Sequence, residues 1–378
     1  MPDVSTYNGI DMGDIASING QDIAASGGAY NPVTGAGTYT ETVPSTGMVH
    51  YGYDRAAVDA SNIYAGAFIG DGSTSQTVLN FSSDVDGAVQ AFTVSQMAKS
   101  WTKIDCSKYV WAGIEGGRLW MASWSVNYVH QTSNPSVLTQ VTSLSGASDT
   151  GWTDVSVGSD FVLAINGGKL FVVGENGDGQ LGTGDRTDVS TLTQIGGASG
   201  DTDWFAVSAG DDHSAAIKGA SGDRSLLTTG ENNDGKCGSG DTSGDDTSWT
   251  ERVAADASED WAFVEAGYHH TIAILAGKLY VTGNGASERF GNNSTSSVTS
   301  FTQEGKIDAG GTFGTNWTSG TTNYYATFLV NSSGEVWYAG AGYGGTGSGN
   351  TTMAQAGYYV KTSGNASAGT LGSLGGSD

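Results

Sequence analysis

Short apolar runs separated by glycine-rich turns recur along the chain at a nearly constant interval. From Trp152, a glycine follows after six residues, an isoleucine after thirteen, a leucine after eighteen and a closing glycine after twenty-two. Trp261 repeats all of these offsets. Trp101 repeats those of the isoleucine and leucine, Trp204 repeats those of the first glycine and the isoleucine, and Trp317 keeps an apolar residue, Val330, after thirteen. We therefore count six repeat units, which start near residues 50, 101, 152, 204, 261 and 317.

The interval between these starts, 51 to 57 residues, suits four short strands with their turns, which is the size of one β-propeller blade. A sheet this small cannot cover both of its own faces, so the units must pack on one another, and a ring leaves only short edges exposed. We predict an all-β fold, a propeller of six or seven four-stranded blades over residues 38–362. An extended N-terminal arm and linker (1–37) and a glycine- and serine-rich tail (363–378) complete the chain.

The repeat also predicts where strands turn and end. Glycine recurs at one position in the segments 63–68, 114–119, 165–170 and 274–279, which indicates a tight hairpin because glycine accepts positive φ. A fourth strand is predicted in each unit, at residues 91–94, 137–141, 192–195, 250–253, 301–303 and 358–361. One further strand, at 38–43, is expected either to close the ring against the last unit or to remain a spare edge strand.

Two glycine-rich segments carry a family resemblance. Residues 174–184, GENGDGQLGTG, resemble the G-x-N-x-x-G-Q-L-G-x-G signature of the regulator of chromosome condensation repeats, and residues 230–240, GENNDGKCGSG, are a degraded copy. The G-x-x-H segments 210–213 and 267–270 are similar to the second-strand signature of that family. The resemblance covers residues 48–362 and implies a β-propeller, usually of seven blades. It gives little guidance to function, because one fold hosts many functions.

Acidic side chains greatly outnumber basic ones. The 39 Asp and Glu residues against 15 Lys and Arg give a formal charge of −24, which repels phosphate backbones and anionic lipid headgroups. Nucleic acid is therefore not an expected partner. No apolar run is long enough to insert into a membrane, and the first residues lack the features of a secretory signal. We expect the chain to fold in the cytosol.

Histidine and cysteine are the first candidates for chemistry. His213 and His270 occupy equivalent places in two units, with carboxylates nearby in sequence. An acid–base role would need a nucleophile or carboxylate held beside the imidazole, whereas the repeat favours a structural role in which each imidazole bonds the backbone of a neighbouring blade. Cys106 and Cys237 lie two units apart, which is too distant for a disulfide, and we expect free thiols.

The loops that follow the third strands are the second candidates. Those at 174–188 and 230–246 are rich in Asp and Asn, whose oxygen atoms can bind calcium. Neither loop has the order of a known calcium loop and Asx turns explain the same residues, so we predict no cofactor or metal. These loops differ most between units, and Trp124, Tyr128 and Tyr343 are candidate ligand-binding residues that could stack on a sugar or a partner protein. Packing between blades is the alternative.

The first 25 residues contain a short internal repeat. Asn8-Gly9-Ile10-Asp11 is echoed eleven residues later by Asn19-Gly20-Gln21-Asp22. The segment 8–24, NGIDMGDIASINGQDIA, resembles N-terminal segments of structural proteins from tailed phages of marine bacteria. That resemblance implies a docking arm that inserts into a neighbouring virion subunit; an arm lying on its own propeller is the alternative. The apolar anchors would be Ile10, Ile15, Ile18 and Ile23.

These features lead to the hypothesis of a non-enzymatic phage virion structural protein, whose propeller is a display or adhesion module and whose arm fixes it to capsid or tail. Its partners would be other virion proteins, and it would be present in multiple copies and assembled in the host cytoplasm. Two alternatives stay open: a tail-tip protein that binds host-surface glycans or proteins, and an intracellular protein-interaction propeller of a bacterium. A polysaccharide-degrading enzyme would need two carboxylates about 5 to 9 Å apart, which sequence does not reveal.

Overall fold

The chain is almost entirely β in the residues that the computed structural model describes, which are the strands between residues 6 and 90 and then 101–106, 110–123, 139–196, 201–253, 260–292, 294–306, 311–322, 326–333, 336–340 and 360–361. Within them, the one helical element is a 3-10 turn, η5 (Ala286–Glu288). No helix in this part of the chain is long and apolar enough to cross a membrane.

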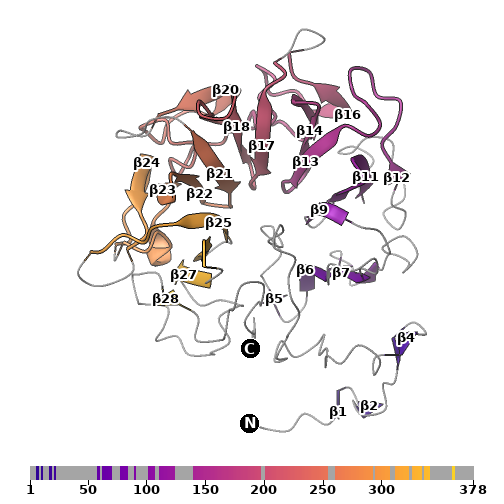
Figure 1. Ribbon diagram of the computed structural model, residues 1–378, viewed down its shortest axis with the longest axis horizontal. Helices are drawn as coiled ribbons and strands as arrows, with labels where there is room; N and C mark the ends of the chain where they lie inside the picture. The colour runs from indigo at the N-terminus through magenta and orange to yellow at the C-terminus, as the bar shows by residue number, and fades with distance from the viewer. Residues whose placement is uncertain are drawn as a thin grey trace.

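Each repeat unit forms one four-stranded antiparallel sheet, and we number these sheets blades 1 to 6. Figure 1 shows the blades arranged around a common centre, with β9, β13, β17, β21 and β25 innermost in blades 2 to 6. The predicted propeller is therefore confirmed, with six blades among the described residues. The strands are β5 (Val58–Asp59), β6 (Asn62–Ile69), β7 (Thr77–Ser83) and β8 (Val89–Gln90); β9 (Trp101–Cys106), β10 (Val110–Glu115), β11 (Arg118–Ser123) and β12 (Thr139–Gln140); β13 (Trp152–Val157), β14 (Phe161–Asn166), β15 (Lys169–Gly174) and β16 (Val189–Gln194); β17 (Trp204–Ala209), β18 (His213–Lys218), β19 (Ser225–Gly230) and β20 (Asp246–Arg252); β21 (Trp261–Ala266), β22 (His270–Leu275), β23 (Lys278–Gly283) and β24 (Val298–Glu304); β25 (Trp317–Thr322), β26 (Ala326–Asn331), β27 (Val336–Gly340) and β28 (Val360–Lys361).

The hydrophobic core is divided among the junctions between successive blades. Four clusters each combine apolar side chains of two neighbouring blades: 2 with 3, 3 with 4, 4 with 5, and 5 with 6. At the blade 2/3 junction, Ile114 and Met121 of blade 2 share a cluster with Val155 and Phe171 of blade 3, and each is at most 2% exposed. Burial of one such side chain stabilises the fold by about 1.5 to 3 kcal/mol. The blades therefore shield one another's faces.

The tryptophan that opens a unit fastens it to the preceding blade. Trp152, Trp204, Trp261 and Trp317 begin β13, β17, β21 and β25 and are 1 to 6% exposed. After each of them the register with the second strand shifts, and such a β-bulge bends the strand and re-aims its side chains. The backbone N–H of Trp152 donates to the Gly117 carbonyl of blade 2 at 3.0 Å, and the other three make the equivalent bond.

Glycine turns join the second and third strands of blades 2, 3 and 5, as the repeat predicted. Gly117 and Gly168 have φ of 73° and 78°, a region that side chains with a Cβ disfavour. A Cβ on Gly168 would also lie 2.0 Å from the carbonyl oxygen of Thr202, just before the next blade. Glycine is therefore required here both by its own conformation and by the close approach of the neighbouring chain.

The hairpin predicted at residues 63–68 of the first unit is wrong. There β6 runs unbroken through Gly66 and pairs with β7, with Gly66 opposite Asn80. A glycine between two alanines stays extended when a partner strand pairs with it, and the next residues, 70–76 (GDGSTSQ), are of turn-forming types. The first unit therefore has four strands but turns later than the others.

The fourth strands lie close to their predicted places, but several begin earlier. In blades 3, 4 and 5 the ladder already includes the residue opposite the closing glycine, as in the pair of Gly174 with Val189. A bulge then separates this first pair from the rest of the ladder, so the apolar run alone underestimates the strand. In blade 1, β8 precedes the predicted residues 91–94, and the predicted strand at 38–43 lies outside the described residues.

The N-terminal arm contains two short hairpins. In both, the two residues between the strands are Asn-Gly, the sequence most typical of two-residue hairpin turns. The eleven-residue echo in the sequence is thus a repeated hairpin, and Figure 1 shows both hairpins outside the ring of blades. Their paired strands are β1 (Thr6–Tyr7) with β2 (Ile10–Asp11), and β3 (Ser17–Ile18) with β4 (Gln21–Asp22).

Candidate interaction face

Half of the strand connections of each blade lie at one end of the propeller. Because antiparallel strands alternate in direction, the connection from first to second strand and that from third to fourth emerge together. In blades 3 to 5 these connections are residues 158–160, 175–188, 210–212, 231–245, 267–269 and 284–297. We call them the loop face, and both glycine-rich signature segments belong to it.

Each signature loop folds around a buried asparagine. The Nδ2 group of Asn176, which is 0% exposed, donates to Thr183 Oγ1 and to the carbonyl of Asp185, both at 2.9 Å. Its Oδ1 accepts from the N–H of Leu181 at 2.9 Å. One side chain thus satisfies groups along the whole loop, which explains why asparagine recurs at this position. The equivalent Asn232 donates to Ser239 Oγ at 2.7 Å and the Asp241 carbonyl at 3.2 Å, and accepts from the N–H of Cys237 at 3.1 Å.

Hydroxyl groups fasten the signature loop of one blade to the strands of the next. Ser214 Oγ of blade 4 donates to the carbonyl of Gln180 in blade 3 at 2.7 Å. Thr229 Oγ1 of blade 4 donates to the carbonyl of Gly179 at 2.8 Å. Each signature loop is therefore held in shape by the following blade as well as by its own sheet. The blade 4/5 junction repeats both bonds at 2.7 Å, from Thr271 to the carbonyl of Lys236 and from Thr282 to the carbonyl of Gly235.

The third glycine of the G-x-N-x-x-G-Q-L-G-x-G signature makes room for an aromatic ring of the next blade. A Cβ on Gly182 would lie 2.3 Å from Trp249 Nε1, and one on Gly238 would lie 2.7 Å from a ring carbon of Phe301. Trp249 lies on β20 and Phe301 on β24, the fourth strands of blades 4 and 5. The signature is thus a device for joining blades.

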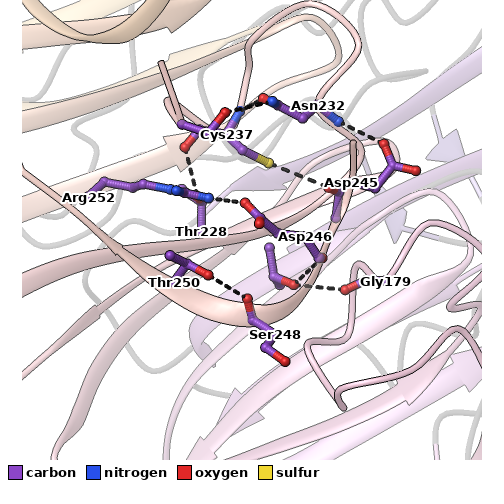
Figure 2. A network of polar contacts seen from close by, with 12 residues as sticks. Gly179, Thr228, Asn232, Cys237, Asp245, Asp246, Ser248, Thr250 and Arg252 are labelled. Carbon is purple, nitrogen blue, oxygen red and sulfur yellow. Dashed lines mark hydrogen bonds and ion pairs between the residues drawn. The ribbon is translucent and has the colours of Figure 1, made fainter. Parts of the chain in front are cut away.

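The blade 4 loop is also tied to its own sheet, as Figure 2 shows. Arg252 Nε donates to Thr228 Oγ1 at 2.8 Å, and Thr228 Oγ1 donates to the carbonyl of Cys237 at 2.7 Å. The backbone N–H of Asn232 donates to Asp245 Oδ1 at 3.2 Å, at the far end of the loop. Bonds from both ends and from the middle fix this loop on its blade.

His213 and His270 have a structural role, but they bond hydroxyl groups rather than the predicted backbone. His213 Nε2 lies 2.7 Å from Thr271 Oγ1 of the next blade, and His270 Nε2 lies 2.8 Å from Thr327 Oγ1. Because the Thr271 hydroxyl gives its proton to the carbonyl of Lys236, His213 is the donor to Thr271. Burial lowers the pKa of both imidazoles well below the ordinary value, so both are neutral. The atom that each histidine bonds belongs to the next blade, so the sequence of one repeat does not identify it.

A belt of polar contacts links the innermost strands around the axis. Asp105 of β9, 1% exposed, accepts from Ser156 Oγ at 2.9 Å and from the N–H of Val157 at 2.8 Å, both in β13. Ser156 Oγ accepts in turn from the N–H of Ala209 in β17 at 3.0 Å. These buried groups are satisfied by the next blade, so they set how the blades align. The belt continues through Lys103 with Asp154, Asp154 with Val207, Ser208 with Glu265 and Ala266, and Thr321 with Glu265.

Four carboxylates gather at the blade 3/4 junction of the loop face. Glu175 and Asp178 belong to the signature loop of blade 3, and Asp211 and Asp212 belong to the β17–β18 connection of blade 4. Burial, followed by neighbouring carboxylates, raises the pKa of Glu175 and that of Asp178. Burial, followed by the charge of Asp211, raises the pKa of Asp212 to about 7. The junction therefore concentrates negative charge. Arg186 offsets part of it, since its Nη1 lies 3.8 Å from Asp178 Oδ1.

The predictions on thiols and calcium have different outcomes. Cys237 is a free, fully buried thiol, and burial raises its pKa to about 12; the side chain of Cys106 lies outside the described part. In the signature loop, Asp185 Oδ1 accepts from the N–H of Thr187 at 2.9 Å and from Thr183 Oγ1 at 3.1 Å, which is an Asx turn of the predicted kind. Among the described residues, no three His, Cys, Asp or Glu side chains are placed to hold a metal.

The residues predicted to bind partners are not tested by the structure. Ile10 begins β2 and Ile18 ends β3, and their side chains lie outside the described part of the chain. So do Ile15 and Ile23 of the arm. The loop residues Trp124 and Tyr128, between β11 and β12, and Tyr343, between β27 and β28, also lie outside the described residues, and their roles stay predictions.

Comparison with known proteins agrees with this architecture. A family model described as the regulator of chromosome condensation (RCC1) repeat matches residues 167–217, from the β14–β15 turn through the signature loop into β18. The family model covers one repeat, and the fold as a whole is a β-propeller similar to those of the RCC1 structures. No curated protein sequence matches it significantly.

Three solved structures resemble the RCC1-like propeller in fold. Prp20p from Saccharomyces cerevisiae, which was studied for its binding to Gsp1p and histones, has a TM-score of 0.56 at 15% identity, over 70% of this chain and 64% of that chain. Human WBSCR16 has a TM-score of 0.57 at 16% identity, over 72% and 69%. Yeast RCC1 (Prp20) bound to Kap60 has a TM-score of 0.60 at 13% identity, over 79% and 73%. At such identities the likeness concerns the fold alone.

Sequence reasoning missed the hydroxyl groups that join the blades of the RCC1-like propeller. A signal was present, because a small hydroxyl residue follows the start of the second strand in three units, as Ser214, Thr271 and Thr327. Reasoning from the signature also missed that Gln180 and Lys236 occupy the same loop position with different charge. Comparison of the units position by position, rather than by their shared skeleton, would find both.

Proposed function

We propose that this RCC1-like propeller is a non-enzymatic protein-interaction module of a phage virion, attached to other virion proteins by its N-terminal arm. The observation that carries the proposal is the division of the chain into a ring of mutually packed blades and a repeated hairpin outside that ring (Figure 1). Two similar hairpins offer a partner two similar contacts, which strengthens attachment. The virion setting rests on the resemblance of residues 8–24 to N-terminal segments of phage structural proteins.

The described residues favour interaction over catalysis. His213 and His270 are buried and neutral, and their Nε2 groups are bonded to neighbouring blades. The buried carboxylates Asp105 and Glu265 accept hydrogen bonds within the belt. Prp20, the yeast RCC1, binds other proteins, and a rigid ring that presents loops at one end suits the same kind of role.

Deletion of residues 1–25 tests the proposal. We expect the shortened chain to unfold at the same denaturant concentration as the full chain, because the blade junctions remain intact, and to be absent from purified particles of the phage that encodes it. Deletion of residues 363–378 is the matched control, since it removes a segment from the other end of the chain and should leave incorporation unchanged. Mass spectrometry of purified particles measures the copy number of each form.

Three outcomes would count against this function. Normal incorporation of the chain without residues 1–25 would refute the docking role of the arm. Absence of the full chain from particles would favour an intracellular interaction propeller. New reducing ends released from host envelope polysaccharide would show an enzyme instead.

A further inference from the structure

The two signature loops place equivalent side chains at neighbouring blade junctions. In both, the carbonyl of the seventh signature residue accepts a hydrogen bond from a hydroxyl of the next blade, so the backbones correspond. We compare five positions at each junction. Those of the blade 4/5 junction are Glu231, Asp234, Lys236, Tyr268 and His269, and those of the blade 3/4 junction are Glu175, Asp178, Gln180, Asp211 and Asp212, in the same order.

The blade 4/5 junction neutralises its own acids. Lys236, whose side chain is 3% exposed, forms an ion pair with Glu231, and its Nζ lies 3.4 Å from the carbonyl of Tyr268. His269 Nδ1 lies 2.8 Å from Asp234 Oδ2. With His269 neutral, two carboxylates and one ammonium give the five positions a formal charge of −2 + 1 = −1. An internal lysine thus fills this junction.

The blade 3/4 junction has the same acids, but its own signature loop supplies no lysine. Gln180 stands where Lys236 stands in the next unit, and Asp211 and Asp212 replace Tyr268 and His269, so the formal charge of the five positions is −4. Three groups offset part of this charge. Ser159 Oγ donates to Asp211, Arg186 lies near Asp178 while also pairing with Asp245 at 2.9 Å, and the positive charge of Lys236 in the next loop acts on Asp212. Burial, followed by neighbouring carboxylates, raises the pKa values of Glu175 and Asp212.

A buried and unpartnered amide is the second, independent observation. Gln180 is 0% exposed, and its Oε1 accepts from the N–H of Asp178 at 3.0 Å. Its Nε2 has no hydrogen-bond partner among the described residues. A buried donor without an acceptor destabilises the fold, so an acceptor at this point would be favoured. A peptide segment supplies both missing groups, because its lysine carries a cation and its backbone carries carbonyl acceptors.

We propose that the blade 3/4 junction binds a lysine side chain of a partner protein, with Glu175, Asp178 and Asp212 around the ammonium group and the Gln180 amide donating to a carbonyl of the partner. The lysine would occupy the place that Lys236 fills internally one blade further on. This proposal rests on the interaction function proposed above and names the chemistry of the partner. A small polyamine lacks the carbonyl and should bind more weakly than a peptide of equal charge.

The first test measures binding of N-acetylated tetralysine amide to the full chain by isothermal titration calorimetry. We expect Glu175→Gln/Asp178→Asn to weaken binding by about tenfold, equivalent to about 1.4 kcal/mol. The control Asp201→Asn/Asp223→Asn removes the same charge from connections at the other end of blade 4 and should change affinity by about twofold or less. Equal losses in the two double variants would mean that the peptide responds to net charge alone, and would overturn the proposal.

A second variant supplies the missing cation from within. Gln180→Lys reproduces Lys236 on a matching backbone, so the chain should remain folded while tetralysine binding falls by about tenfold, equivalent to about 1.4 kcal/mol. Unchanged binding by a folded Gln180→Lys chain would refute the site. Carbodiimide coupling of the bound peptide, followed by mass spectrometry, should modify Glu175 or Asp178, and predominant coupling elsewhere would contradict it.

The pH dependence gives an independent readout. Asp212 faces Asp211, Glu175, Asp178 and Glu231 as well as the cation Lys236. The junction binds an ammonium group best when the Asp212 carboxyl is ionised. Tetralysine affinity should therefore rise between about pH 6 and pH 8 while lysine stays charged, and Asp212→Asn should abolish the rise. A rise that persists in Asp212→Asn would contradict the site. Failure of these tests would leave arm-dependent incorporation into particles unaffected, so the two proposals fail separately.

Discussion

Replacement of Asn232 by aspartate tests whether the signature asparagine holds the loop together. The change replaces the side-chain NH2 group by an oxygen atom and leaves the volume of the side chain almost the same. Asn232 is 0% exposed and donates from Nδ2 to Ser239 Oγ at 2.7 Å and to the carbonyl of Asp241 at 3.2 Å. A carboxylate cannot donate to that carbonyl, and it also meets the Asp241 side chain, whose Oδ1 lies 3.4 Å from Nδ2. Asn233 is the next residue and is exposed, so Asn233→Asp is a control with the same change in charge.

The expected loss is about 3 kcal/mol. One or two hydrogen bonds contribute about 1 kcal/mol each, and the new carboxylate oxygen, buried at the place of Nδ2 and facing the carbonyl of Asp241, adds about 1 to 3 kcal/mol. Asn233 donates to Glu231 Oε1 at the surface, a contact worth about 1 kcal/mol or less. The introduced carboxyl group is buried beside Asp241, so its folded pKa lies above its unfolded value. Its destabilising effect is therefore smallest below the unfolded pKa and grows as pH rises through the folded pKa.

Urea unfolding followed by tryptophan fluorescence at about pH 5 and pH 7 measures both effects. Asn232→Asp should unfold at a lower urea concentration than Asn233→Asp at both values, with the larger difference at pH 7. If the two variants unfold together, the buried asparagine does not organise the loop, and the account of the signature is refuted. A difference that is independent of pH would instead refute the burial of the introduced charge.

Three further predictions follow from glycine packing, carboxylate burial and the buried thiol. Gly182→Ala should cost about 2 to 4 kcal/mol because its Cβ would overlap Trp249, whereas Gly167→Ala, also at positive φ but with open space around it, should cost about 1 kcal/mol; thermal unfolding compares them. Burial, then Asp211, raises the pKa of Asp212 to about 7, so the stability that its protonated form contributes is full below the unfolded value of 3.8 and is lost as pH rises to about 7. Asp212→Asn should therefore match the native chain near pH 4 and exceed it at pH 8 by about 1 to 2 kcal/mol after solvent screening, and a pH-independent difference would contradict this. Burial raises the pKa of Cys237 to about 12, so a thiol reagent should modify it only as fast as the chain unfolds, and rapid labelling of the folded protein at Cys237, located by mass spectrometry, would contradict its burial.

The sequence predicted where the signature loops of the candidate interaction face lie, but not which contacts hold them in place. The segments 174–184 and 230–240 predicted the loops correctly. Their contacts with Ser214 and Thr271 were not predicted, because each loop is bonded to a residue of the next unit, 34 or 35 residues further along the chain. The wrong hairpin at 63–68 has a related cause: offsets between apolar residues do not say whether a glycine turns or stays extended, and a partner strand decides it.

The sequence by itself determined the repeated unit, because glycine turns and alternating apolar residues are local requirements of a small antiparallel sheet. It also determined the repeated Asn-Gly hairpins of the arm, whose geometry needs no distant contact. Only the tertiary structure decided what occupies each blade junction: His213 on a hydroxyl rather than a backbone group, Gly182 against Trp249, and an acidic junction at Gln180 where the next unit has Lys236. A junction is made by two units at once, so its chemistry depends on residues that no single repeat contains.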